Sequence, residues 1–452
     1  MLGNGLMPAP GARPSPRILF GHPPGLVLLF LVEMWERFSF YGMRAMLIVY
    51  MTAVVLPDAP THVAGYQAVC ALLHLDPAQA GTVRISSELY GVYSGFVYLT
   101  PLLGGLLADR LFGKRATIIG GGLLIVAGHL LLTTPRWFLA ALLLIVVGTG
   151  GVKGNIAAQM ADLYEPDDPR RERGFSIFYV GINIGATAAP LVCALLAERA
   201  GWNAAFMATS AGMILGLALY VLGARHLPER QAEWAASRGR RAVSGGHPAA
   251  LLTVLSISSV FLWISYEQQA NALVRWLGTG PSDIGMAWLQ AIPPAMVLIG
   301  TPVLTLRWSA QARAGREPGP GTKMLIGAAI ILAMQCLLGA LSVVLGGRAP
   351  SPWLAALYFA GWEVGDLYFS PAAMGLFSRL ARPGYESMTM AVWYLTIFAG
   401  NLASGWIGGM WGSVGISAYW LLIAALTAVG VAAMAICRPL IMRTPHAVVQ
   451  DA

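Results

Sequence analysis

The chain has 452 residues, of which 57% are hydrophobic and only 11% are charged, and its mean hydropathy is +0.65. A soluble protein is about one-quarter charged, so this composition excludes an ordinary soluble domain and is typical of many membrane-spanning helices. The net charge is +8, but the basic residues are spread between apolar segments rather than gathered in one patch, so we expect no nucleic-acid partner.

Residues 1–23 are rich in Pro and lack the long apolar run of a signal peptide, so we expect a cytoplasmic tail. Twelve apolar segments of spanning length follow it, at roughly 24–54, 86–111, 115–133, 137–162, 174–197, 202–222, 249–276, 284–306, 323–346, 352–380, 387–411 and 415–437. A polar, Arg-rich stretch divides them six and six. The predicted units are therefore an N-terminal bundle at 24–222, a cytoplasmic linker at 223–248, a C-terminal bundle at 249–437 and a cytoplasmic tail at 438–452.

The basic residues between these segments support the count. With the N-terminus in the cytoplasm, 21 of the 29 Lys and Arg residues fall in cytoplasmic loops and tails, and five fall on the opposite side. Such a bias toward the cytoplasm sets the orientation of membrane proteins. We therefore predict a multi-pass protein of the cell membrane with both termini in the cytoplasm.

The chain shows no pattern of an enzyme or of a metal site. Its four cysteines are scattered without CxxC or CxH spacing, which argues against a metal site or a disulfide framework. No HExxH motif, GxSxG nucleophile elbow or phosphate-binding loop is present. We expect neither catalytic residues nor bound metal.

The first apolar segment contains Glu33, Glu36, Arg37 and Arg44. Their spacing, with Tyr41 between them, places these side chains on one face of a helix over three turns. A charge that faced lipid at the helix centre would cost about 2.5–3.5 kcal/mol, so the stripe should face a water-filled cavity. The pattern alone leaves two interpretations open, a proton-coupling cluster or a static network that holds helices together.

Several motifs resemble known transporter signatures. The loop "GGLLADRLFGKRATI" between the second and third segments resembles the cytoplasmic loop of the major facilitator superfamily. "ExxERFxFYG" in the first segment is similar to the ExxER-F-x-YY signature of the proton-dependent oligopeptide transporter (POT/PTR) family. Further segments resemble that family's fourth, fifth, seventh, tenth and eleventh helices, namely "GTGGVKGN", "FSIFYVGINIGA", "WISYEQQ", "GDLYFSP" and "AVWYLTIFAGN".

The resemblance covers nearly the whole chain and implies an all-α membrane protein with the major facilitator fold. That fold has 12 transmembrane helices in two six-helix bundles, with the substrate between them near the middle of the membrane. The linker at 223–248 is too short for the two extra helices that many bacterial members insert, because each span needs about 20 residues.

The resemblance also implies roles for individual residues. Proton coupling would depend on Glu33, Glu36, Arg37 and Lys153. Gate salt bridges would join Arg44 to Glu267 on the extracellular side and Lys153 to Asp366 toward the cytoplasm. The substrate-binding residues would be Arg37, Tyr41, Tyr93 (or Tyr98), Lys153, Asn183, Trp263, Glu267, Asp366 and Trp393. For the aromatic residues, simple packing stays an equal alternative.

Four positions depart from the family pattern. Phe40 replaces the first tyrosine of the YY pair, and Gly154 replaces a proline. Asp366 stands where the family has glutamate, and Glu363 lies one turn earlier and could share its role. Pro293 occupies the position of an asparagine that helps to hold the peptide amine. We therefore expect an intact proton site and an altered amine end of the substrate site.

These observations predict a proton-coupled symporter that imports di- or tripeptides or peptide-like compounds by alternating access. Its partners would be the peptide substrate, protons and the lipid bilayer, it would use the proton gradient and no cofactor, and it would function as a monomer. Two alternatives stay open. The same fold could carry a non-standard peptide-like natural product inward or outward, or the protein could be a membrane sensor that transports nothing.

Overall fold

The computed structural model describes residues 21–77, 79–165, 168, 170–228, 249–278, 286–380 and 386–442. Within these ranges the regular elements are all helical, and twelve of the helices are long. The first six are α1 (Pro24–Tyr50), α4 (Thr82–Leu107), α5 (Gly113–Leu131), α6 (Phe138–Asp162), α7 (Arg170–Ala200) and α8 (Trp202–Gly223). The second six are α9 (Ala249–Glu267), α11 (Ile292–Arg313), α12 (Pro320–Val344), α13 (Pro352–Leu380), α14 (Glu386–Gly408) and α15 (Ile416–Ile436).

Short helices connect or extend the long ones. They are α2 (Ala59–His62), α3 (Tyr66–Leu72), α10 (Ala272–Leu277) and α16 (Arg438–Met442). Cys70 lies in α3 and is buried, and all four cysteines are free thiols. Most of the predicted linker, residues 229–248, lies outside the described ranges, as do the tails at 1–20 and 443–452.

Ten segments of the described chain are long and apolar enough to cross a membrane. One of them, Thr82–Leu131, contains α4, a π-helical turn at Ala108–Phe112, and α5, which begins at Gly113 with a φ of 75° that favours glycine. Helix α13 is long but falls outside the ten segments, and it carries Glu363 and Asp366. The predicted all-α membrane protein is therefore confirmed.

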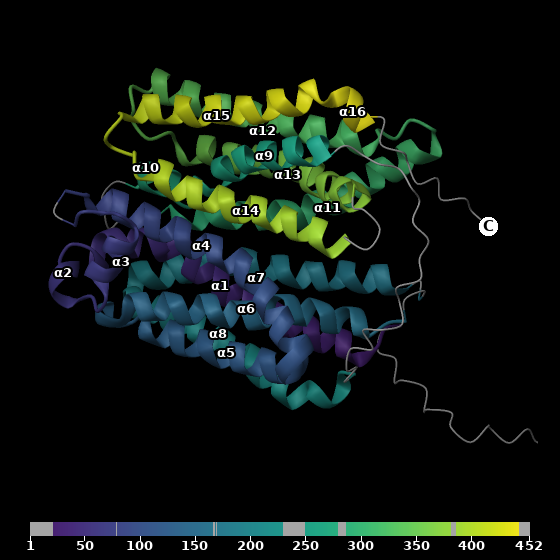
Figure 1. Ribbon diagram of the computed structural model, residues 1–452, viewed down its shortest axis with the longest axis horizontal. Helices are drawn as coiled ribbons and strands as arrows, with labels where there is room; N and C mark the ends of the chain where they lie inside the picture. The colour runs from purple at the N-terminus through teal and green to yellow at the C-terminus, as the bar shows by residue number, and fades with distance from the viewer. Residues whose placement is uncertain are drawn as a thin grey trace, which may run out of the picture.

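The long helices form two groups that lie side by side (Figure 1). In the first group α1 packs against α7 and α8, and α5 packs against α6. In the second group α12 packs against α13 and α15, and α9 packs against α14 and α15. The groups meet where α4 packs against α14 and α7 against α11. We call the end at which α1 finishes and α4 begins the outer end, because the charge bias predicts it to be extracellular; it is on the left in Figure 1.

The contact between α4 and α14 brings two backbones together. A Cβ atom added to Gly91 of α4 would lie 2.6 Å from the Cα of Gly405 of α14. Any larger side chain would therefore force the two helices apart. The two groups are thus closed against each other at the outer end.

Candidate functional site

Helix α1 holds a buried cluster of three charges. The Nε atom of Arg37 lies 2.9 Å from Oε1 of Glu33 and 2.5 Å from Oε2 of Glu36. All three side chains are buried, and Oε2 of Glu33 has no hydrogen-bond partner in the described structure. An unpaired buried carboxylate oxygen is costly, and one guanidinium cannot neutralise two carboxylates. The cluster therefore has the chemistry to take up one proton.

Lys153 of α6 faces this cluster from the neighbouring helix. Its Nζ lies 4.0 Å from the centre of the Tyr98 ring, a cation–π contact. It is close enough to interact electrostatically with both Glu33 and Glu36. Lys153 can therefore respond to the protonation state of either acid.

The predicted pair between Lys153 and Asp366 is not formed in this structure. Asp366 instead accepts a hydrogen bond of 2.5 Å from the hydroxyl of Ser370, one turn later on α13. In the described part of the chain Lys153 makes the aromatic contact and no ion pair. Closure of the inner end through these two residues stays a prediction for another state of the protein.

The other predicted pair is formed and joins the two groups of helices. Nη2 of Arg44 on α1 lies 2.8 Å from Oε2 of Glu267 at the end of α9. Nε of Arg44 donates to the hydroxyl of Tyr90 on α4 at 2.9 Å, and that hydroxyl donates to Glu267 at 3.3 Å. The guanidinium also lies over the ring of Tyr266, 5.6 Å from its centre. Three helices therefore meet at one buried ion pair.

A second polar contact, formed by Arg275 of α10, also joins the two groups. Its Nη1 donates to Ser87 Oγ of α4 and to Asn271 Oδ1, both at 2.8 Å, and its Nη2 donates to Ser86 Oγ at 2.5 Å. In the sequence, Arg275 stands out only as one of the five basic residues on the extracellular side. A repeat of four residues from Trp263 through Glu267 and Asn271 reaches Arg275, and extending that stripe by one step would have found it.

The predicted substrate residues differ in their surroundings. Tyr41 borders a small cavity of about 30 Å³ between the two groups, together with Arg44, Tyr266 and Pro293. A cavity of this size is suited to about one water molecule. Asn183 is buried, and its amide donates to the carbonyl of Tyr179 at 2.9 Å.

Among the aromatic candidates, Trp393 is the most tightly packed. Its ring is 5.9 Å from that of Trp263 and 5.1 Å from that of Phe377, and it is only 2% exposed. The indole nitrogen of Trp263 and the hydroxyl of Tyr93 are both buried and have no hydrogen-bond partner in the described structure. Trp263 and Tyr93 each have a free polar group that a ligand can bind. In this state Trp393 instead acts as a packed core residue.

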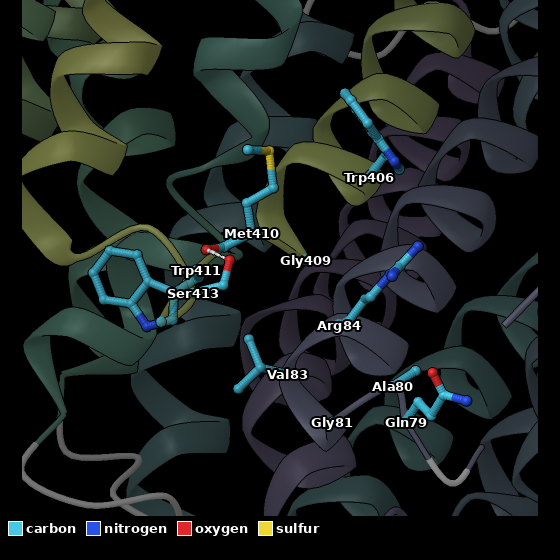
Figure 2. A pocket seen from close by; sticks show the side chains of 11 residues that line it. Gln79, Ala80, Gly81, Val83, Arg84, Trp406, Gly409, Met410, Trp411 and Ser413 are labelled. Carbon is cyan, nitrogen blue, oxygen red and sulfur yellow. Dashed lines mark hydrogen bonds between the residues drawn. The ribbon is translucent and has the colours of Figure 1, made fainter. Parts of the chain in front are cut away.

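A larger hollow of about 580 Å³ lies at the outer end, away from the residues that the sequence predicts for the site. It is formed by the start of α4 and by the end of α14 with the loop that follows. Figure 2 shows Arg84 and Trp406 on one side of it and Trp411 on the other. Its walls therefore belong to both groups of helices.

Comparison of the sequence with known proteins identifies the family of this chain. A family model described as "POT family" matches residues 115–237 and 247–419. The uncharacterized transporter YclF of Bacillus subtilis is 28% identical, over 94% of this chain and 95% of its own. The di-/tripeptide transporter of Lactococcus lactis subsp. cremoris is 29% identical, over 84% of this chain and 88% of its own.

Solved structures agree with the sequence comparison. The crystal structure of a peptide transporter POT in complex with sulfate is 26% identical, with a TM-score of 0.78 over 95% of this chain and 97% of that one. The family model covers well over half of the 452 residues, and the motif-bearing residues Glu33, Arg37, Arg44 and Glu267 lie together in buried ion pairs. The chain belongs to the POT family of membrane transporters.

Proposed function

We propose that this protein is a proton-coupled symporter that imports di- or tripeptides or closely related compounds by alternating access. The observation that carries the proposal is the position of Arg37 between Glu33 and Glu36, with Lys153 facing them. The names of its relatives, a di-/tripeptide transporter and a peptide transporter POT, agree with a peptide substrate. The proton gradient supplies the energy, and no cofactor takes part.

Proton uptake and helix movement are coupled through Arg37. While both acids are ionised they compete for one guanidinium, and protonation of one acid releases Arg37 to the other. Lys153 and Arg37 then have positive charge available for a substrate carboxylate. Because an opposite charge favours the ionised acid and burial favours the neutral one, the arrival of a carboxylate between these cations promotes protonation. Substrate and proton therefore load together.

The zwitterionic ends of a peptide match the charges of the two groups of helices. Lys153 of α6 lies in the first group, and Asp366 of α13 lies in the second. A peptide carboxylate at Lys153 and a peptide amine at Asp366 would draw the groups together at the inner end. A bound peptide would thus stand between Lys153 and Asp366 in place of a direct ion pair between these two residues. That pair is not formed in this structure.

Uptake into liposomes tests this proposal. Wild-type protein should accumulate a labelled dipeptide under an inward proton gradient, and Glu36→Gln should abolish accumulation while leaving exchange of peptide across the membrane. Glu198→Gln is the matched control, because Glu198 is exposed near the end of α7. Failure of a broad set of di- and tripeptides to be taken up by the wild type would overturn the substrate, and unchanged accumulation in Glu36→Gln would overturn the coupling.

A further inference from the structure

Helix α13 carries two acids, Glu363 and Asp366, one turn apart. The opposite face of the same helix packs on α12, where a Cβ atom on Gly365 would lie 2.7 Å from Ile331 and 3.0 Å from the carbonyl of Gly327. With about 100° between successive residues, Glu363 is some 200° away from Gly365 around the helix. The carboxylate of Glu363 therefore projects away from α12.

Glu363 faces the space between the two groups of helices. Tyr266 of α9 and Tyr179 of α7 are both close enough to interact with it electrostatically. Tyr266 lies beneath the guanidinium of Arg44 and borders the small cavity with Tyr41. Glu363 is thus a neighbour of side chains from both groups, at the level of the expected substrate.

The carboxylate of Glu363 has no partner of its own. Asp366 accepts the hydroxyl of Ser370, but in the described structure Glu363 takes part in no hydrogen bond and no ion pair. The side chain is only 6% exposed, so this unpaired carboxylate is nearly buried. A nearly buried acid with no counter-ion, facing the space where the substrate is expected, is a site for a cation.

Among the described charged residues between the two groups of helices, Glu363 is the acid that a zwitterionic peptide leaves without a positive partner. Once one of Glu33 and Glu36 carries the proton, Arg37 balances the other acid and Lys153 is available for the substrate carboxylate, while Arg44 balances Glu267. A zwitterionic peptide brings one carboxylate and one ammonium group, and the ammonium group has Asp366 as its partner. Glu363 then has no positive charge opposite it unless the substrate supplies a second one.

We propose that Glu363 is a specificity-determining residue that favours peptides with a second positive charge, such as a lysine or arginine side chain, over neutral peptides. The proposal rests on the proposed function and adds a substrate class to it. Glu363 and Asp366 together form a two-acid clamp on α13, in which Asp366 binds the terminal amine and Glu363 binds the basic side chain.

Binding to the purified full-length protein tests the substrate class separately from transport. At pH 7 lysyl-alanine should bind the wild type about tenfold more tightly than alanyl-alanine, as expected for one additional partly buried charge pair. Glu363→Gln should remove this preference and leave the affinity for alanyl-alanine within about twofold. Glu198→Gln should retain the wild-type preference, and unchanged binding of alanyl-alanine shows that the variant is folded.

The outcomes separate the two proposals. Equal affinity of the wild type for both dipeptides, or an equal loss of both in Glu363→Gln, would overturn the role of Glu363, since the second result indicates a general or proton-carrying acid. Uptake of both peptides in liposomes is measured in parallel. Selective binding without uptake would refute the symporter and retain the two-acid clamp, whereas uptake without selectivity would do the reverse.

Discussion

Arg44 and Glu267 show how much a single buried contact can decide. Both side chains are almost fully buried, and their atoms are 2.8 Å apart. Removing one partner of a buried ion pair typically costs about 3–5 kcal/mol, because the other charge is left uncompensated. Removing both avoids that penalty, so the pair predicts a non-additive pattern.

We therefore expect Arg44→Ala and Glu267→Ala each to lower the thermal unfolding temperature. The double variant should lower it by clearly less than the sum of the two single losses, because no charge is then left without a partner. Melting curves of the three purified variants in detergent measure this. Arg84→Ala is the control, because its side chain is exposed and pairs with Glu88 within one helix. Additive losses would show that Arg44 and Glu267 contribute independently.

Single residues also mark the limit of what the sequence could predict. The spacing of Glu33 and Arg37 predicts their contact, since residues four apart on a helix face each other, and the structure forms it. His129 of α5 is fully buried, with its ring nitrogens 2.8 Å from Ser39 Oγ and 3.3 Å from Thr209 Oγ1, partners that no local spacing could identify. Long-range partners such as Ser86 and Arg275 could not be paired, because no local spacing relates α4 to α10.

At the scale of elements, the predicted segment 249–276 is interrupted. Helix α9 ends at Glu267 and α10 begins at Ala272, with Asn271 between them. Hydropathy detects the apolar run but not the break, because contacts from elsewhere in the chain pair some of the polar groups there, although Asn271 Nδ2 has no partner in the described structure. Asn271 Oδ1 accepts from both Arg275 and Ser87, and Gln268 donates to Ser404 of α14 at 2.9 Å.

The break places Arg275 at the contact between the two groups of helices. We expect the loss of the Arg275 side chain to loosen the outer end. Arg275→Met removes three donated hydrogen bonds while keeping most of the side-chain volume. A cysteine at Ser94, a buried position on α4, in a variant without the four native cysteines, should then react several-fold faster with an impermeant maleimide added outside. Arg84→Met should leave the rate unchanged. An equal rate with and without the Arg275→Met change would show that this contact does not hold the gate.

The start of α7 gives a prediction for pH. Arg170 donates from its side chain and from its backbone amide to Asp168, and these bonds lower the pKa of the Asp168 carboxyl below its ordinary value of 3.8. A lowered pKa stabilises the folded helix end above that ordinary value, and the contribution is lost as the pH falls through the lowered pKa. Hydrogen exchange should therefore show less protection of the first α7 amides at about pH 2.5, below the ordinary pKa of an aspartate, than at about pH 6, above it.

Asp168→Asn provides the comparison for this experiment. The variant keeps the size of the side chain but cannot ionise, so its α7 amides should be less protected at the higher pH and should change little between the two pH values. Equal pH dependence in the variant and the wild type would assign the effect to other groups.

At the scale of the whole molecule, the state of the transporter is the feature that sequence could not predict. Both charge pairs, Arg44–Glu267 and Lys153–Asp366, can be proposed from the same motifs, but only the first is formed here. A sequence specifies the residues of every state in the cycle, and it does not say which contacts exist together. The number of long helices and the membrane location were predictable, because hydropathy and charge bias are properties of each segment alone.

Closure of the outer end depends on two glycines, and this predicts a block of the cycle. Gly91→Ala should prevent α4 from reaching α14 and lower proton-driven uptake about tenfold or more, because the new methyl group would meet the backbone of Gly405. Gly105→Ala on the same helix is the control, since a Cβ atom there meets nothing within 4 Å. Uptake assays on both variants in liposomes make the comparison, and equal activities would refute the role of this contact.

The proton site formed by Glu33, Glu36 and Arg37 has a consequence for the electrical behaviour of the cell. A proton carried inward with a neutral peptide moves one elementary charge, and each charge gains about 2.3 kcal/mol per 100 mV of membrane potential. That energy corresponds to a concentration ratio of roughly fiftyfold. A basic peptide held at Glu363 would move a second charge and gain the same amount again. Voltage, as well as acidity, would therefore determine which peptides the cell collects.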